Sequence, residues 1–317
     1  MSAGSIAGIR SWRVALGFML LIGACLSGAP AQADRFPSAA ADYEYSDTRE
    51  LVSTVEDAAR LLEARGQDAF REFEVPGSRW HHDTSYMYVY TADGDCLFNS
   101  GQPNLVGKNL REYRDTAGRP VVLELMDIAA RPEPHAAGWA FFLFQAGNVL
   151  TPVWKITYNV KATLPDGTVV VVGSGRFSLK MERRFMTERV DEAASLVQTR
   201  GAELAFSTFI DPASRFNILG SYIFALDMKG HALVDPSFPT MPGRDLSGMT
   251  DAIDRSYVRE LLSKLKHADT ASILFFWRAN VNDVPQRKAI YARKVEADGG
   301  PYIVGIEYLL PTPLWMK

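Results

Sequence analysis

Residues 94–125, GDCLFNSGQPNLVGKNLREYRDTAGRPVVLEL, return in altered form as residues 230–261, GHALVDPSFPTMPGRDLSGMTDAIDRSYVREL. One constant offset keeps glycine, proline, acidic and leucine positions in register along both stretches. The pairs include Gly94 and Gly230, Pro103 and Pro239, Gly107 and Gly243, Asp115 and Asp251, and Leu125 and Leu261. Register of this kind along a whole stretch indicates an internal duplication.

The repeat extends in both directions from these stretches. Upstream, residues 55–62 match residues 190–197, and both copies continue into an Arg-Gly pair. Downstream, the offset drifts slightly but still pairs three further positions. These are Lys155 with Lys288, Tyr158 with Tyr291, and Gly173 with Gly305. The sequence therefore predicts two homologous domains, at residues 34–178 and 179–317.

The first 33 residues resemble a secretory signal peptide rather than part of the fold. Arg10 and Arg13 precede the apolar run at residues 14–26, and Ala31 and Ala33 provide small residues before a cleavage site at Asp34. A competing site exists at Cys25. The sequence Ile-Gly-Ala-Cys at residues 22–25 resembles a lipobox and predicts a lipid-anchored N-terminus. Both alternatives place the mature chain outside the cytoplasm, with a periplasmic location expected.

The composition is that of an ordinary globular protein. The chain has 317 residues, of which 47% are hydrophobic and 22% charged, and its formal net charge is −3. Because no stretch of lysine and arginine forms a basic stripe, we do not expect a nucleic-acid partner. After the leader, no apolar run is long enough to span a membrane.

Each copy predicts one long helix followed by a meander of strands. The apolar spacing favours helices over residues 46–73 and 179–209, with a short helix at 120–130. Stretches rich in β-branched and aromatic residues, separated by turn-forming pairs such as Asp93-Gly94, predict the strands. The short turns between these strands imply antiparallel pairing. The expected strands lie at 85–91, 96–98, 139–144, 153–161 and 168–172, and again at 222–226, 232–234, 273–277, 288–295 and 302–308. The fold class is therefore α+β, with a helix on one face of each five-stranded sheet.

This order of elements and motifs resembles the single-Cache extracellular sensor domain. The resemblance rests on the Tyr-Val-Tyr strand, the Asp-Gly turn, Pro-x-x-x-Gly-Lys-Asn-Leu at residues 103–110, Asp115 with Gly118, and Lys-x-x-Tyr at residues 155–158. It implies two tandem PAS-like modules that hold small molecules such as short carboxylates, amino acids or amines. A double-Cache arrangement fits less well, because each copy has its own long helix. Asp254 stands where the first copy has Gly118, so the second inter-strand loop is expected to differ.

The candidate ligand-binding residues combine cations and aromatic side chains on the strands. Lys155 and Lys288 recur at one strand position and could pair with a buried carboxylate, the alternative being solvated lysines at a strand edge. Strand alternation places Lys155 and Tyr158 on opposite faces unless a bulge intervenes. His82 lies before the first strand, where a polar contact at the cavity rim is favoured over a metal ligand. The remaining candidates are Tyr88, Tyr90, Trp139, Tyr222, Phe224, Trp277 and Tyr291.

No arrangement of residues predicts an enzyme or a cofactor. The sequence has no Gly-x-Ser-x-Gly, phosphate-binding loop, Cys-x-x-Cys or His-Glu-x-x-His motif, and capping explains Asp115 and Asp251. We therefore predict a periplasmic binding or sensing protein that acts with a separate sensor kinase, chemoreceptor or transporter. The alternative is a non-binding scaffold or accessory subunit of an envelope complex.

Overall fold

The computed structural model describes residues 38–82, 85–144, 151–177, 179–278, 280 and 282–310. These ranges belong to one contact unit, Phe36–Lys317. The predicted signal peptide, its cleavage site and the alternative lipidation site at Cys25 lie outside the described residues.

The first module is built around a five-stranded antiparallel sheet with the order β4-β3-β7-β6-β5. A two-stranded ribbon, in which β1 pairs with β2, precedes it. The strand predicted at residues 85–91 is divided at Met87, and its first part pairs with β1. The other four predicted strands are present, with β5, β6 and β7 longer than expected. The strands are β1 (His81–His82), β2 (Ser85–Tyr86), β3 (Tyr88–Thr91), β4 (Cys96–Asn99), β5 (Ala137–Phe144), β6 (Val153–Thr163) and β7 (Val169–Arg176).

The long helix of the first module ends earlier than predicted. Helix α1 spans Ser46–Arg65 and stops at Gly66, whose φ of 58° is favourable for glycine and ends the regular helix. The chain continues as the 3-10 turn η2 (Gly66–Ala69) and the short helix α2 (Phe70–Phe73). The predicted short helix is present as α3 (Val121–Ala129). Two further 3-10 turns are η1 (Ala40–Asp42) and η3 (Pro103–Leu105).

The second module repeats this plan. Its sheet has the order β10-β9-β13-β12-β11, and the two-residue strand β8 pairs with β9 beside it. The predicted long helix is divided at Gly201, which has a φ of 83°. The elements are α4 (Arg183–Arg200), α5 (Ala202–Ile210), β8 (Asn217–Ile218), β9 (Ser221–Asp227), β10 (Ala232–Val234), α6 (Tyr257–Leu265), β11 (Thr270–Trp277), β12 (Gln286–Ala297) and β13 (Gly300–Leu309).

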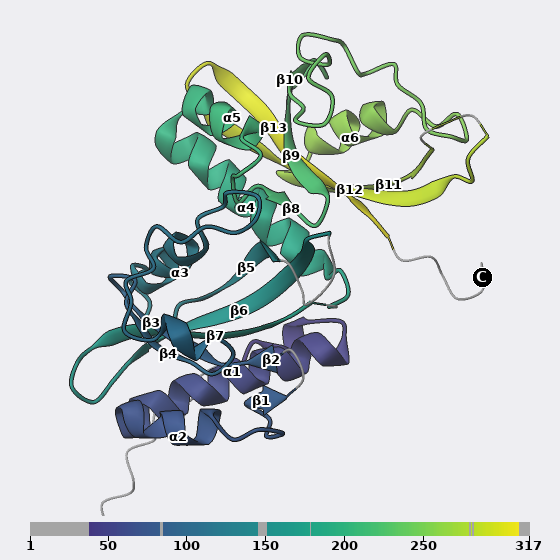
Figure 1. Ribbon diagram of the computed structural model, residues 1–317. Helices are drawn as coiled ribbons and strands as arrows, with labels where there is room; N and C mark the ends of the chain where they lie inside the picture. The colour runs from purple at the N-terminus through teal and green to yellow at the C-terminus, as the bar shows by residue number, and fades with distance from the viewer. Residues whose placement is uncertain are drawn as a thin grey trace, which may run out of the picture. The chain divides into compact units, whose positions relative to one another are not determined.

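Each sheet has helices on both faces, so each has two cores. In the first module, α1 packs on β6 and β7 through residues such as Val55 and Leu62, which share a cluster with Val160. On the opposite face, α3 contributes Leu125 to a second cluster that includes Tyr90. Helices α4 and α6 cover the two faces of the second sheet in the same way (Figure 1). The face under α3 carries a small cavity in the first module, and the face under α6 carries one in the second.

The repeated aspartates shape equivalent turns. Asp115 Oδ1 accepts hydrogen bonds from the backbone N–H groups of Ala117 and Arg119, and Asp251 Oδ1 accepts those of the equivalent residues 253 and 255. Both carboxylates therefore serve structural roles, as predicted. The expectation that the second loop differs is wrong, because Asp254 adopts a φ of 62° where Gly118 has 81°. Aspartate tolerates this left-handed conformation better than most residues do.

Candidate functional site

The first cavity lies between α3 and the sheet and is lined mostly by aromatic and apolar side chains. Tyr86, Tyr88 and Tyr90 occur at alternate positions, so their side chains share one sheet face. The cavity has a volume of about 120 Å³. The lining residues are Tyr86, Tyr88, Tyr90, Asn99, Gln102, Leu105, Tyr113, Val121, Leu125, Phe142, Phe144, Lys155, Thr157 and Phe177.

Lys155 contributes a buried positive charge to this cavity. Its residue is only 3% exposed, and its Nζ lies 3.6 Å from the ring centroid of Tyr86 and 5.5 Å from that of Phe177. Nζ forms no ion pair with a carboxylate of the described residues. Burial lowers the pKa of Lys155 to about 7. When protonated, the amine therefore faces an aromatic cavity with no acid of the described residues to compensate its charge.

A hydrogen-bonded network forms the polar part of the cavity wall. Tyr88 Oη donates to Asn159 Oδ1 at 2.6 Å, and Asn159 Nδ2 donates to Thr157 Oγ1 at 3.1 Å. Thr157 and Lys155 lie two positions apart on β6 and therefore share a face. Burial raises the pKa of Tyr86 to about 12, which keeps its hydroxyl neutral near pH 7. The cavity thus offers neutral hydrogen-bonding groups around one cation.

The second cavity occupies the equivalent place in the second module but is smaller. Its volume is about 40 Å³. Here Lys288 Nζ lies 3.3 Å from Glu307 Oε2 and 4.3 Å from the ring centroid of Trp277. Burial raises the pKa of Glu307, and the Lys288 ammonium opposes that rise. The lining residues are Tyr222, Phe224, Leu226, Ala232, Val234, Asp235, Leu246, Tyr257, Val258, Leu261, Ile290 and Glu307.

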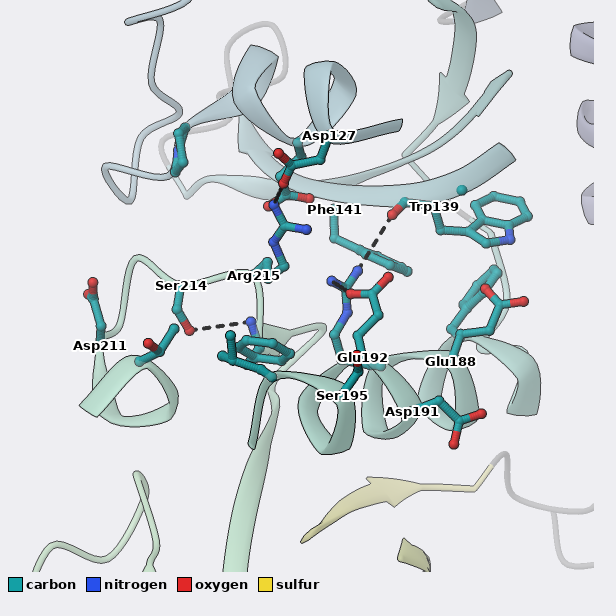
Figure 2. Close-up of a pocket in the computed structure, with 18 of the residues that line it drawn as sticks. Asp127, Trp139, Phe141, Glu188, Asp191, Glu192, Ser195, Asp211, Ser214 and Arg215 are labelled. Atoms are coloured by element: carbon teal, nitrogen blue, oxygen red, sulfur yellow. Dashed lines mark hydrogen bonds and ion pairs between the residues drawn. The ribbon is translucent and has the colours of Figure 1, made fainter. Parts of the chain in front are cut away.

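A wider groove of about 1,030 Å³ is lined by residues of α3, β5, α4 and the segment after α5. Figure 2 shows Arg215 turned toward Asp127, whereas Asp191 points away from both. Arg215 forms an ion pair with Asp127, and Arg189 Nη1 lies 2.8 Å from Glu192 Oε2 while Nη2 donates to the Trp139 carbonyl at 3.5 Å. Because these acids and guanidinium groups pair with one another, we do not propose the groove as a ligand site.

The structure brings five of the residues predicted from the sequence into the two cavities. Tyr88, Tyr90 and Lys155 line the first, and Tyr222 and Phe224 line the second. Lys288 and Trp277 are not among the lining residues, although Lys288 contacts the lining residue Glu307. Their roles in ligand binding remain predictions.

Four other predicted residues lie elsewhere. Trp139 and Tyr158, whose ring centroids are 4.9 Å apart, belong to the buried cluster that joins the cores under α1 and α4, and Tyr291 packs against the same cluster. Trp139 also lines the wider groove. Strand alternation explains this placement, because Tyr158 and Tyr291 each follow the cavity-facing lysine by three residues. His82, in the ribbon β1–β2, does not line the first cavity. We do not propose these four as ligand contacts.

Sequence reasoning missed several polar residues of the cavities. Tyr86 and Thr157 could have been found by strand alternation, since they lie two positions from Tyr88 and Lys155. Asn99 comes from the end of β4, and Gln102 and Tyr113 come from the segment between β4 and α3, where no periodic pattern indicates side-chain direction. Glu307 was also missed, because it has no acidic counterpart in the first copy.

The described residues contain no group of three or more histidine, cysteine, aspartate or glutamate side chains arranged to hold a metal ion. Among the same residues, no helix is both long enough and apolar enough to cross a membrane.

Comparisons with solved structures give weak overall similarity. A methyl-accepting chemotaxis protein from Vibrio parahaemolyticus is 18% identical, with 41% of this chain and 88% of that chain covered and a TM-score of 0.32. The periplasmic sensor domain of a chemotaxis protein is 24% identical, with coverages of 40% and 87% and a TM-score of 0.31. Among curated proteins, none matches the chain.

The family comparison covers most of the chain. The model of single Cache domain 2 matches twice, at residues 40–176 and 188–307. Each match contains one helix-backed antiparallel sheet with its own cavity. Cache domains are extracellular modules that sense small molecules, and the chain belongs to the single Cache domain 2 family, with two copies of the domain in tandem.

Proposed function

We propose that the protein is an exported sensor of small molecules and that its first module binds a short carboxylate. The observation that carries this proposal is the Lys155 ammonium, which is buried in an aromatic cavity without an acidic partner among the described residues. A carboxylate entering the cavity would supply that partner and form a charge-assisted hydrogen bond.

The free energy of burying Lys155 supports a binding role over a structural one. A pKa lowered from 10.5 to about 7 corresponds to a cost on the order of 5 kcal/mol for the charged form. No acid within the described chain offsets this cost, so the amine weakens the fold instead of stabilising it. Functional sites commonly retain such unfavourable groups because a ligand completes them.

The size of the cavity limits the ligand. A cavity of about 150 Å³ accommodates benzene, which has six heavy atoms, so the 120 Å³ of the first cavity suits a molecule of about four to six heavy atoms. Acetate, propionate and pyruvate fall in this range. The tyrosine rings would contact the ligand's carbon atoms, while the side-chain amide of Asn99, which lines the cavity, offers a hydrogen bond beyond the lysine.

Isothermal titration of the purified protein with acetate, propionate and pyruvate tests the proposal. We expect binding to the wild type and a loss of at least 50-fold in affinity for Lys155→Met. The same substitution should raise the free energy of unfolding, because methionine fills similar volume without a charge. Lys288→Met, at the equivalent position of the second module, is the matched control and should leave this affinity unchanged.

The proposal fails if none of these acids binds, or if Lys155→Met binds them as tightly as the wild type. A scaffold role would then be the better explanation of the duplicated fold.

We also propose that a separate membrane protein reads the bound state, since Cache domains serve in sensing. The partner would be a chemoreceptor, sensor kinase or transporter. Cells that lack the chain should lose their response to the acid, and cells carrying Lys155→Met should resemble them. Sequencing the N-terminus of the mature protein distinguishes cleavage before Asp34 from lipidation at Cys25.

A further inference from the structure

The two cavities come from equivalent strands but differ at a few positions that decide their contents. Thr157 pairs with Gly175 across β6 and β7, and Ile290 pairs with Glu307 at the same place in β12 and β13. Gly175 has no side chain to offer its cavity, whereas the side chain of Glu307 lines the second cavity. The copies therefore differ by one carboxylate at one position of the sheet face.

The carboxylate of Glu307 reaches the lysine that corresponds to Lys155. Lys155 pairs with Phe142, and Lys288 pairs with Phe275, so the two lysines occupy the same position in their sheets. Both contact an aromatic ring through Nζ, yet among the described residues only Lys288 has an acidic partner, with Nζ 3.3 Å from Glu307 Oε2. Glu307 thus supplies from within the chain the group that a bound acid would supply to Lys155.

Neighbouring side chains reduce the remaining space and make it less suitable for an anion. The ring of Tyr257 stacks on that of Phe275 at a centroid distance of 4.5 Å, where the sequence repeat places Val121 in the first module. Asp235 lines the second cavity at the position of Asn99 and brings a second carboxyl group. The cavity retains about 40 Å³, compared with about 120 Å³ in the first module.

We propose that Glu307 is a built-in carboxylate that occupies the acid site of Lys288 and closes the second module to external carboxylates. This inference rests on the proposed function of the first module, because it treats Lys288 as the counterpart of an acid-binding lysine. It assigns the two modules different roles, with ligand response confined to the first.

Replacing Glu307 tests the inference by chemical rescue. The experiment is done in a Lys155→Met background, so that the first cavity contributes no acid binding. Glu307→Ala removes the carboxylate and leaves room beside Lys288, whereas Glu307→Gln keeps the volume and removes only the charge. Acetate is the probe, titrated by calorimetry and by thermal unfolding at constant ionic strength with chloride.

We expect Lys155→Met/Glu307→Ala to bind one equivalent of acetate at least tenfold more tightly than Lys155→Met/Glu307→Gln. Acetate should raise the melting temperature of the alanine variant, because a ligand that binds only the folded state stabilises it. Adding Lys288→Met should abolish the effect. Glu307→Ser provides a second opening variant should the alanine variant fail to fold.

Two results would overturn the inference. One is a folded Glu307→Ala or Glu307→Ser variant that binds acetate no better than Glu307→Gln. The other is acetate binding by Lys155→Met alone that Lys288→Met removes, since the second site would then be open in the natural sequence. Failure of the proposed function would be recognised differently. The wild type would then bind no acid, regardless of the results for the variants at position 307.

Discussion

Tyr88 Oη donates a buried hydrogen bond of 2.6 Å to Asn159 Oδ1, linking β3 to β6 across the intervening strand β7. The sequence repeat places Phe224 and Ala292 at the equivalent positions of the second module, so the second copy has lost both partners together. A buried hydrogen bond is costly to break on one side only, whereas replacing both groups by apolar ones is close to neutral.

Tyr88→Phe should therefore lower the free energy of unfolding by about 1–3 kcal/mol, because it leaves Asn159 with an unsatisfied buried acceptor. Asn159→Ala alone should cost a similar amount. The double variant Tyr88→Phe/Asn159→Ala should cost less than the sum of the two by about 1 kcal/mol or more. Urea unfolding of the four proteins measures this coupling, and strict additivity would show that the bond contributes nothing specific.

Acid binding by the first module should weaken as pH rises above about 7. The pKa of Lys155 is lowered to about 7 by burial, so the free protein loses the ammonium proton above that pH. A carboxylate ligand needs this proton, and its apparent affinity should fall by up to tenfold per pH unit between pH 7 and 9. Calorimetry in buffers of different ionisation enthalpy should also detect proton uptake on binding near pH 8.

Lys155→Arg separates this explanation from a general effect of alkaline pH. Arginine remains protonated throughout the range, so any binding that the variant retains should be independent of pH between 6 and 9. Equal pH dependence in the wild type and the arginine variant would contradict the role assigned to Lys155.

The repeat and the strand alternation were sufficient to predict the fold and part of the first cavity. The constant spacing between Gly94, Asp115 and Leu125 and their counterparts predicted two modules, and the aromatic strand predicted at residues 85–91 supplied Tyr88 and Tyr90. The helix ends were less predictable, because Gly66 interrupts an apolar pattern that continues beyond it. A left-handed residue ends a helix without changing the pattern of apolar side chains.

The ligand-facing side of the sheet was not predictable from aromatic content. Both faces of the first sheet are buried, one under α1 and the other under α3, so Trp139 and Tyr158 are as aromatic and as buried as Tyr88. Helices cover both faces, so the small cavity under α3 can be located only from the packing of the side chains. Glu307 was not predicted because the search relied on features shared by the two copies, whereas Glu307 is a difference between them.

Gly173→Ala should displace side chains that form the wall of the first cavity. A Cβ at Gly173 would overlap Asn159 Oδ1 and lie 2.6 Å from Tyr88 Cε2, so the two partners of the 2.6 Å hydrogen bond would have to separate. We expect a loss of about 2–3 kcal/mol in the free energy of unfolding and weaker acid binding. Gly248→Ala is the matched control, because nothing lies within 4 Å of its Cβ. Comparable losses in both variants would remove the steric explanation.

The stability of the protein should fall as pH rises from about 4.5 to 7, in part because of Glu124. This residue of α3 is buried, and burial raises the pKa of its carboxyl to about 7, although Arg189, Arg215 and Arg119 partly oppose the rise. The unfolded chain releases the proton near pH 4.5 and the folded chain only near pH 7. Between these values the folded state binds more protons, so the free energy of unfolding decreases with pH.

Glu124→Gln removes this titration while keeping the side-chain shape. Its free energy of unfolding, measured by urea titration, should change less than that of the wild type between pH 4.5 and 7, by about 2–3 kcal/mol over the whole interval. Other carboxyl groups titrate in the same interval, so the decisive quantity is the difference between the two proteins at each pH. A difference that stays constant from pH 4.5 to 7 would mean that Glu124 is already ionised in the folded protein, held charged by the three arginines.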